Sequence, residues 1–566
     1  MGVTHSQTTN SWIGRSDGKW ERERHWDDGL PSITQSAVII SNANSKVVTI
    51  DKHTARKFPD SLTISNLTVS AQGGDTNTLF LENTGTVALH ILNDLTIGIG
   101  LNNFGDPFTR EGALISTNST LIVDGLLDGQ LEDNGTIVIT GGSLITTNCS
   151  LQVAVPTDNP AVGLLIISNT IVQARDVTVA ASYSESSGTM EVISGIMTLS
   201  SSLTVGNSDG RGDGGYGSLL VANGCMLVVT NEDTGIINGT MTVANASFLG
   251  AGVFLGGGKS FGELAINNGT VTLSGGIEVA LGDRSSGNVS LNGGMLIVTN
   301  NAINMGAVPG VGNFAVSDGI FLGQAMFLLE STLSIQGGTS ILSSNLVLYF
   351  GSAFYINGGQ LFVTNAPIII RSGRASIVSG GLLAANYIDF ADGQLLINGG
   401  SVTVSTGITL GNCDGTAVGY ASVDGGQLTV TNAAHTGFID VRSGEVTLDG
   451  GTLQVDKLVM TNSCGSFIHT GGTLIVGSVV LDPNAFRITS VAREGNNLRV
   501  TWLMGPGQTN ALQVSSGGIH GSYNTNSFTD IFVVTNNTFP GTLTNYLDIG
   551  AATNKPSRFY RARLAP

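Results

Sequence analysis

The acidic and histidine side chains are the residues that could carry catalysis, and their spacing argues against it. Polysaccharide lyases and hydrolases need carboxylates clustered on one face, for calcium or for acid/base chemistry, usually with a basic side chain nearby. In this sequence the acidic residues are mostly isolated, the only Asp-Asp pair is Asp27-Asp28, and the 7 histidines are scattered. We therefore expect a protein that is not an enzyme, and a polysaccharide lyase or hydrolase is the enzymatic alternative.

One segment has the composition of a calcium-binding loop, namely Asp209-Gly-Arg-Gly-Asp213-Gly-Gly. Its carboxylates could bind Ca²⁺, an ion that prefers oxygen ligands. The segment occurs once, however, and lacks the nine-residue iteration of calcium-stacking repeats. The sequence contains no Cys-x-x-Cys and no paired histidines that would indicate zinc. No cofactor is therefore expected, and Ca²⁺ at Asp209 and Asp213 is the alternative.

The tryptophans are the side chains best suited to stacking on a sugar ring, because an indole offers a large apolar face and a polar N–H. Three of the 4 lie near the amino end, as Trp12, Trp20 and Trp26. The first turn of a stacked β structure exposes an unpaired edge and an open core, which large aromatic side chains can plug. We expect residues 1–35 to form such a cap, and a carbohydrate-binding surface made by these three indoles is the alternative.

The elements that must position these residues follow a repeat between Gly275 and Val476. Each unit has a turn ending in Gly-Gly or Asp-Gly, then a few residues in which every second side chain is apolar, and often Thr-Asn. Nine steps cover the 196 residues from Gly276 to Gly472, about 22 residues a step, which indicates a solenoid. Period-two alternation indicates short strands with one buried face, and no apolar 3.6 period accompanies it. The fullest units are Gly293-Gly-Met-Leu296-Ile-Val-Thr-Asn300, Gly358-Gly-Gln-Leu361-Phe-Val-Thr-Asn365 and Gly425-Gly-Gln-Leu428-Thr-Val-Thr-Asn432.

Coils of such strands can pair their backbones and bury their apolar faces only by stacking on one another. We therefore expect an all-β protein whose main part, residues 36–482, is a right-handed parallel β-helix of roughly 20 coils. The Gly-Gly pairs supply positive φ at the corners. Asparagine also tolerates positive φ, and stacked corner asparagines can form a hydrogen-bonded ladder, unless each is only a turn residue. The asparagines considered are Asn148, Asn231, Asn300, Asn345, Asn365 and Asn432.

A second motif alternates with the first, as in Leu203-Thr-Val-Gly-Asn207, Val279-Ala-Leu-Gly-Asp283 and Ile408-Thr-Leu-Gly-Asn412. Together with the small-residue strand and the Gly-Gly that follow, this unit resembles the β-helix repeats of large secreted bacterial proteins, the autotransporter-associated and PEP-CTERM-associated families. The Trp-rich start is also similar to theirs. The resemblance implies the β-helix fold and a secreted protein. A carboxy-terminal membrane barrel or sorting tail is not apparent, so autotransport and membrane anchoring are not expected.

After Asp482-Pro483 the pattern changes to strands at sandwich-like spacing, so we expect a small β-sandwich over residues 483–566, with Trp502 in its core. The pattern resembles the fibronectin-type or immunoglobulin-like endings of secreted bacterial proteins. Its last strand contains a basic cluster, in which two arginines two residues apart share a face. A docking surface for an acidic partner or a cell-wall polymer is one interpretation, and a solvated edge strand is the other. The cluster consists of Arg558, Arg561 and Arg563.

Composition sets limits on partners and location. The net charge of −17 argues against nucleic acid or an anionic membrane as a partner, since phosphate binding needs clustered Lys and Arg. No apolar run is long enough to span a bilayer, so no membrane insertion is expected. The low proportion of charged residues, 11%, and the many Ser, Thr, Asn and Gly residues suit a protein that works outside the cell. Free thiols are expected because the sequence separations do not suit disulfides between coils; the cysteines are Cys149, Cys225, Cys413 and Cys464.

These observations lead to one functional expectation, a non-catalytic, secreted structural protein of the cell surface or extracellular matrix. As a rigid rod with strand edges at its ends, it is expected to self-associate, including end to end into filaments. A carbohydrate-binding adhesin, with extracellular polysaccharide as its partner, is the second class. The lyase or hydrolase is the third.

Overall fold

The computed structural model describes residues 8–71, 74–98, 111–126, 130–154, 161–180, 186–207, 214–412, 414, 416–461, 464–481, 487–504, 509–517, 527–535, 542–553 and 557–564. The chain forms two compact units, Met1–Asn386 with Leu395–Val402, and Tyr387–Gln394 with Thr403–Pro566. The predicted fold class is confirmed: the strands form a parallel β-helix, followed by small antiparallel sheets near the carboxyl end.

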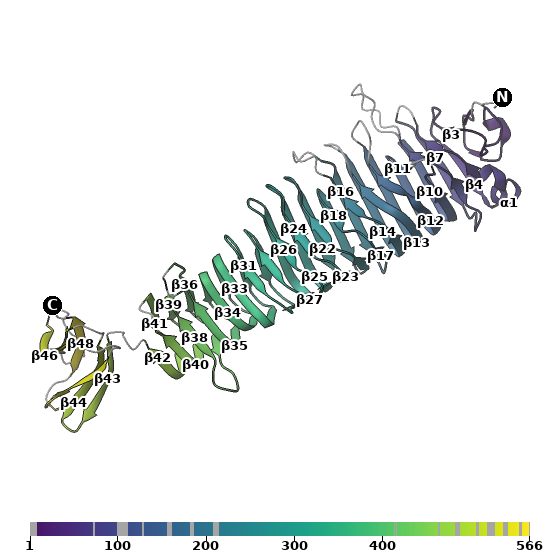
Figure 1. Cartoon of the computed structure of the whole chain (residues 1–566). Coiled ribbons are helices and arrows are strands. Elements are labelled where there is room, and N and C mark those ends of the chain that lie inside the picture. Colours follow the sequence, from purple (N-terminus) through teal and green to yellow (C-terminus); the bar gives the residue numbers. More distant parts are fainter. Residues whose placement is uncertain are drawn as a thin grey trace. The chain divides into compact units, whose positions relative to one another are not determined.

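Three parallel sheets run through the first unit, and successive coils of chain lie side by side along each of them (Figure 1). Sheet 1 contains β2 (Gly18–Lys19), β4 (Lys46–Asp51), β7 (Thr76–Glu82), β10 (Glu111–Val123), β12 (Thr136–Val153), β13 (Val162–Val179), β14 (Ser187–Leu199), β16 (Tyr216–Ala222), β19 (Gly239–Ala244), β22 (Phe261–Asn267), β25 (Ser286–Val298), β27 (Val311–Gly323), β29 (Thr332–Ile335), β32 (Ala353–Ile356) and the end of β33 (Gln360–Val378).

The other two sheets have the same parallel pairing, and the longest strands turn a corner from one sheet into the next. Sheet 2 contains β5 (Thr63–Ile64), β8 (Leu89–Ile91), β17 (Met226–Val229), β20 (Ser247–Gly250), β23 (Gly269–Leu273), β30 (Thr339–Leu342) and parts of β10, β12, β13, β14, β25, β27 and β33. Sheet 3 contains β1 (Thr9–Ser11), β3 (Ala37–Ile40), β6 (Leu67–Val69), β9 (Leu95–Ile97), β11 (Leu131–Asp133), β15 (Leu203–Val205), β18 (Thr234–Ile236), β21 (Val253–Leu255), β24 (Ile277–Val279), β26 (Ile303–Met305), β28 (Met326–Leu328), β31 (Leu346–Leu348) and parts of β12, β13 and β33.

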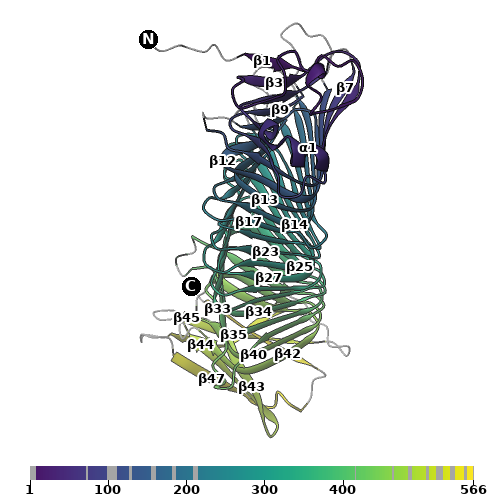
Figure 2. The same cartoon turned by 90° about the vertical axis from the view of Figure 1, so that its right-hand side faces the viewer.

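Helical structure is confined to the amino-terminal end of the first unit, among the described residues. The short helix α1 (Lys52–Lys57) follows β4 directly and lies at this end (Figure 2). Asp51 caps it, because its carboxylate accepts from the backbone N–H groups of His53 and Thr54. The 3₁₀ helices η1 (Glu23–His25) and η2 (Pro59–Leu62) complete this part of the chain.

The alternating pattern places one column of side chains inside. Leu296 and Leu361, the predicted markers of that column, are joined in register through Phe321 and Ser340, and all four are fully buried. Leu428, in the second unit, is also fully buried. The prediction that these leucines point into stacked coils is therefore confirmed, and burial of the column is the main source of stability for a chain with so few charged side chains.

The corner between sheets 1 and 2 requires positive φ, but not at the predicted asparagines. Gly141–Gly142 (φ 69° and 81°) and Gly293–Gly294 (φ 102° and 80°) have it, as expected, whereas Gly358–Gly359 and Gly380–Gly381 do not. The prediction for the six asparagines is wrong, since none of them has positive φ and two instead donate to main-chain carbonyls, Asn231 to Ser200 (2.5 Å) and Asn432 to Ser405 (2.9 Å). Positive φ occurs instead at the residue that connects the sheet 1 strand to the sheet 2 strand. In some coils this residue is glycine or Ser194. In the other coils it is an asparagine, namely Asn83, Asn118, Asn169, Asn223, Asn245 or Asn268.

A row of buried glycines marks the corner between sheets 3 and 1. A Cβ on Gly262 would lie 2.0 Å from the Ile236 carbonyl oxygen and 2.5 Å from the Gly256 nitrogen, the acceptor and donor of one backbone hydrogen bond of 2.9 Å. The corner is closed so tightly that a side chain cannot enter it. The glycines in register along this row are Gly163, Gly188, Gly217, Gly239, Gly262, Gly287 and Gly312.

The second unit contains further parallel strands and two antiparallel sheets. Its parallel strands are β36 (Gly419–Val423), β37 (Gln427–Val430), β38 (Phe438–Val441), β39 (Ser443–Leu448), β40 (Thr452–Met460), β41 (Cys464–His469) and β42 (Thr473–Leu481), while β34 (Leu382–Ile397) and β35 (Ser401–Leu410) contain the boundary between the units. One antiparallel sheet has the order β43 (Arg487–Glu494), β44 (Asn497–Met504), β47 (Thr542–Asp548), and the other β46 (Thr529–Thr535), β45 (Thr509–Ser516), β48 (Arg558–Leu564). Fully buried Trp502 and Leu512 pack in their common core, with Phe532 and Tyr546 against them.

Candidate functional surfaces

The three amino-terminal tryptophans form one buried cluster. Trp12, Trp20 and Trp26 are 1%, 0% and 3% exposed, and Trp26 packs edge to face against both of the others with ring centroids 5.0 Å apart. The Trp26 indole N–H donates to the Trp20 carbonyl oxygen (2.8 Å), and the Trp20 indole N–H donates to that of Ser61 (3.2 Å). This packing favours the cap and leaves none of the three indoles a free face for a sugar ring.

The carboxylates beside this cluster accept hydrogen bonds from the same amino-terminal segment. Asp27 accepts from the Ser11 backbone N–H (2.6 Å), and Asp28 accepts from the Thr8 hydroxyl (2.5 Å). The predicted calcium ligands Asp209 and Asp213 lie outside the described residues. Within the described ranges, no group of three or more His, Cys, Asp or Glu side chains is placed to hold a metal ion.

The basic cluster of the last strand is engaged within its own pair of sheets. The partners are the Asp548 carboxylate for Arg558, the Gln513 amide oxygen for Arg561 (2.7 Å), and the Asp530 carboxylate for Arg563 (3.1 and 2.5 Å). β48 is an edge strand of its sheet. Two of the three charges are thus already balanced by carboxylates, so an acidic partner would have to displace existing ion pairs, and the edge-strand interpretation needs no such step.

The cysteines differ in reactivity. Cys149 and Cys225 are buried thiols, Cys464 is exposed, and Cys413 lies outside the described residues. Burial raises the pKa of both Cys149 and Cys225 to about 11. Since the thiolate is the reactive form, this raised pKa reduces their reactive fraction roughly a hundredfold even before access is considered.

We expect a maleimide at pH 8 to label Cys464 in the folded protein while leaving Cys149 and Cys225 unmodified. Peptide mass spectrometry after timed quenching measures each site separately. The same reaction in urea is the control, and there all three thiols should react at similar rates. Labelling of Cys149 as fast as Cys464 in the folded protein would contradict the buried position of Cys149.

The outward side of sheet 2 is apolar through much of the first unit. Two columns of outward side chains continue in register from β13 to β33, and we call them together the apolar face. The first column is Ile171, Ile196, Met226, Ser247, Thr270, Met295, Ile320, Thr339 and Gln360. The second is Gln173, Thr198, Val228, Leu249, Thr272, Ile297, Leu322, Ile341 and Phe362.

The apolar face is exposed and uncharged. Ile171, Ile196 and Leu249 are 53%, 45% and 43% exposed, and neither column contains an acidic or basic residue. Eleven of the 18 side chains in the two columns are apolar, and the other seven are Ser, Thr or Gln. Monomeric proteins rarely expose large apolar patches without a partner for them.

The outward side of sheet 1 is different, because polar side chains there hydrogen-bond from coil to coil. The Asn288 amide donates to the Glu263 carboxylate (3.0 Å), and the Asn313 amide donates to the Asn288 side-chain oxygen (2.9 Å). The apolar character is therefore a property of one sheet and not of the whole exterior.

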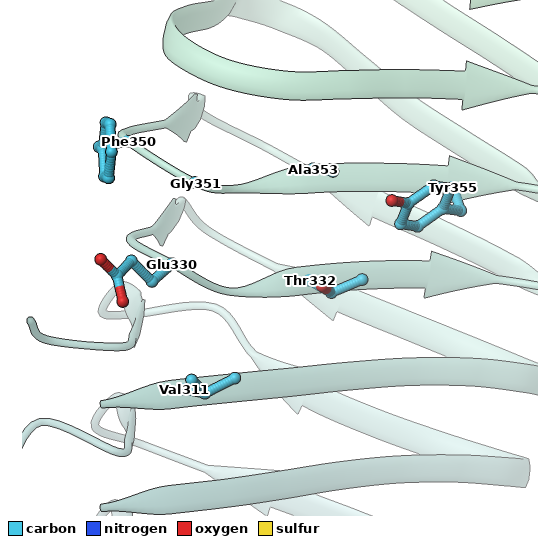
Figure 3. A pocket seen from close by; sticks show the side chains of 7 residues that line it. All are labelled: Val311, Glu330, Thr332, Phe350, Gly351, Ala353 and Tyr355. Atoms are coloured by element: carbon cyan, nitrogen blue, oxygen red, sulfur yellow. The ribbon is translucent and has the colours of Figure 1, made fainter. Parts of the chain in front are cut away.

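A hollow of about 280 Å³ opens on sheet 1, over β29 and β32 (Figure 3). Thr332 and Ala353, paired neighbours on the two strands, lie between the Tyr355 ring on one side and Glu330 with Phe350 on the other. Glu330, Phe350 and Tyr355 come from two successive coils, so their proximity depends on the register of the stack. Nothing in their spacing along the chain marks them as a group.

The apolar face, in contrast, has a signal in the sequence. A search for alternating apolar and polar residues alone does not detect it. In strands with one buried face, apolar side chains alternate with polar ones, whereas strands buried on both faces have continuous apolar runs. The second strand of several coils is such a run, as in Met226-Leu-Val-Val229, Met295-Leu-Ile-Val298 and Ile320-Phe-Leu322.

Comparison with known proteins gives no relative: no protein-family model, no curated protein and no solved structure matches this chain. Among the described residues, no helix has the length and apolar character that crossing a membrane would require.

Proposed function

We propose that this protein is a non-catalytic structural component of the cell surface or extracellular matrix that self-associates side by side through the apolar face. The observation that carries the proposal is the uncharged outward surface of sheet 2 from Ile171 to Phe362, on which 11 of the 18 side chains in the two columns are apolar. Its partner is a second copy of the same chain. The extracellular location rests on the low proportion of charged residues, 11%, and on the many uncharged polar residues.

A second copy fits this face in shape and size. Two β-sheets pack face to face when their outward side chains are apolar and their strands are nearly aligned. Nine strands make the apolar face about 38 Å long, and a strand with its flanking turn residues is about 17 Å wide, which gives roughly 650 Å². A standard stable interface buries about 800 Å² on each partner. The face alone thus supplies most of the area that a homodimer needs.

The chemistry of the face also suits a copy of itself. A two-fold axis places the same patch on both partners, so an uncharged patch brings no like charges together and desolvates none. Side-by-side contact also avoids the amino-terminal end, where the segment of the tryptophan cluster already pairs with β3 and β4 through β1 and β2. Lateral association is therefore the form of assembly we propose, in place of end-to-end contact at that end.

We expect the purified protein to sediment as a dimer or larger species at about 50 µM, and the double variant Leu249→Lys/Ile320→Lys to sediment as a monomer. Two lysines on each partner would bury four charges in the contact, which should weaken association at least a hundredfold. Sedimentation velocity over about 1–200 µM measures this, and circular dichroism checks the fold.

The matched control is Ser218→Lys/Ser290→Lys, which puts the same two charges on the outward side of sheet 1. It should associate like the unmodified protein. The proposal fails if the unmodified protein stays monomeric throughout the concentration range, or if the sheet 2 variant associates as tightly as the control.

A further inference from the structure

We propose that the hollow over β29 and β32 binds one hexose ring of a neutral glycan. This site lies on sheet 1, away from the apolar face of sheet 2, and does not depend on self-association. Its lining combines two aromatic rings with a carboxylate and a hydroxyl (Figure 3).

Phe350 supplies an apolar surface that the fold does not use. Its side chain is 65% exposed at the rim of the hollow, on the turn before β32. An aromatic ring left in water at a turn contributes little to stability, and aromatic faces are the surface on which the C–H groups of a pyranose stack. Tyr355 forms the opposite wall with a second ring.

Glu330 occupies a strained backbone position at the same rim. Its φ is 50°, in the left-handed region that a residue with a long side chain adopts only at a cost. In the next coil the residue beside it is Gly351, with φ 75°, where a Cβ would approach the Glu330 side chain to 3.2 Å. Positive φ recurs at this corner between sheets 3 and 1, at Ala280, Gly306 and Ser372 in other coils, so the fold requires the conformation. The fold does not require a glutamate there, since glycine would adopt the same φ without strain, and a strained residue in such a place is typical of functional positions.

The polar groups of the hollow are available to a ligand. Within the described part of the chain, no hydrogen bond or ion pair engages the Glu330 carboxylate, the Tyr355 hydroxyl or the Thr332 hydroxyl. A carboxylate accepts two hydroxyl hydrogen bonds from a sugar, and the two protein hydroxyls can donate or accept. The volume is at the small end of the range for ligand sites, which suits one ring of a longer glycan.

The charge of the site selects among glycans. Glu330 is the only ionisable residue that can face a ligand from the lining, apart from the Tyr355 phenol, and the whole chain carries a net charge of −17. A uronate would place a second carboxylate beside Glu330, and like charges in contact are unfavourable. The ligand class is therefore a neutral hexose or N-acetylhexosamine polymer and not a polyuronate.

The test is isothermal titration of the full chain with cellotetraose, mannotetraose, tetra-N-acetylchitotetraose and tetragalacturonate. At least one neutral tetrasaccharide should bind with a Kd below about 1 mM, and tetragalacturonate should not bind. Phe350→Ala should weaken that binding at least tenfold, and Glu330→Gln severalfold. Tyr216→Ala removes an exposed ring from the same face several coils away and should bind like the unmodified protein.

Glu330→Gly separates a binding role from a structural one. Glycine relieves the left-handed strain, so this variant should melt at a higher temperature and yet bind the glycan more weakly. The proposal is overturned if no neutral tetrasaccharide binds with a Kd below about 1 mM. It is also overturned if Phe350→Ala binds normally, if Tyr216→Ala loses as much affinity, or if tetragalacturonate binds best.

Discussion

Replacing Gly262 with alanine should destabilise the β-helix by about 3 kcal/mol or more, because the new methyl group would overlap two backbone atoms. Those atoms, the Ile236 carbonyl oxygen and the Gly256 nitrogen, form a hydrogen bond at the corner between sheets 3 and 1. Neither can rotate away as a side-chain end could. Either the corner opens and the hydrogen bond is lost, or the coil shifts and the register on both sides is disturbed.

The matched control is Gly235→Ala, in the neighbouring coil. Its Cβ would meet nothing closer than a side-chain carbon of Ile237 at 3.7 Å, an ordinary contact, and its φ is not in the left-handed region. The midpoint of urea unfolding should fall strongly for Gly262→Ala and change little for Gly235→Ala. Hydrogen exchange should show the loss of protection concentrated in the coils around β18 and β22. Equal midpoints for the two variants would mean that the corner is far more deformable than the close packing of its atoms implies.

The glycine row also shows what the sequence could and could not predict. The Gly-Gly turns and leucines such as Leu296 and Leu361 predict the repeat, because period-two alternation directly reflects which side chains are buried. The single glycines at the start of the sheet 1 strands recur as x-Gly-x-apolar-x-apolar, for example around Gly217, Gly239 and Gly262. They carry no turn. At Gly217 and Gly262 the need for glycine comes from a hydrogen bond between the backbone of their own coil and that of the preceding coil, so it becomes apparent only once the coils are stacked.

The prediction for the corner asparagines fails for a related reason. Asparagine at the end of a strand and asparagine just before the next strand are equally plausible turn residues in one dimension. Only the three-dimensional corner decides that Asn223 and Asn268 have positive φ while Asn300 does not. The sequence thus predicts the need for positive φ at a corner and some of the glycines that meet it, but not the asparagines that do.

The candidate sites depended even more on register. The three amino-terminal tryptophans are large aromatic residues, which is why a sugar-binding surface is one hypothesis for them. Their burial does not follow from the sequence around them. No binding site is predicted at Glu330 and Phe350 from the sequence, since they are 20 positions apart and meet only because one coil lies on the next. A β-helix builds its surfaces across coils, so insertions of one or two residues in a turn decide which side chains become neighbours.

Asp133 is a buried acid in a column of aliphatic side chains. It is the last residue of β11, fully buried, and in register with Ile97 and Val153 on either side. Its Oδ1 accepts from the Gly135 backbone N–H (3.1 Å), while its Oδ2 has no hydrogen-bond partner among the described residues. Burial raises the pKa of Asp133 to about 8. The hydrogen bonds from the Gly135 and Ile137 backbone lower this pKa, but burial has the larger effect. The carboxyl is therefore neutral in the folded protein at pH 7.

This raised pKa makes stability depend on pH in a definite direction. In the unfolded chain an aspartate has a pKa near 3.9, so between about pH 4 and pH 8 the folded state holds a proton that the unfolded state does not. The contribution to stability is complete below pH 4, falls as the pH rises, and is lost once the pH passes the folded pKa near 8. The full span is on the order of 5 kcal/mol, as an upper limit.

The variant Asp133→Asn should remove this dependence, since an amide has the same shape and no charge to bury. At pH 5 the unmodified protein and the variant should unfold at similar urea concentrations, and at pH 9 the unmodified protein should unfold at a clearly lower one. Comparing the two at each pH cancels the contributions of the other carboxyl groups.

The control is Glu278→Gln, which changes an exposed acid on the outward side of the same sheet and should leave the pH dependence unchanged. If the difference between the unmodified protein and Asp133→Asn is the same at pH 5 and pH 9, Asp133 does not carry a buried proton. The strand end at β11 would then have to admit water to the carboxylate.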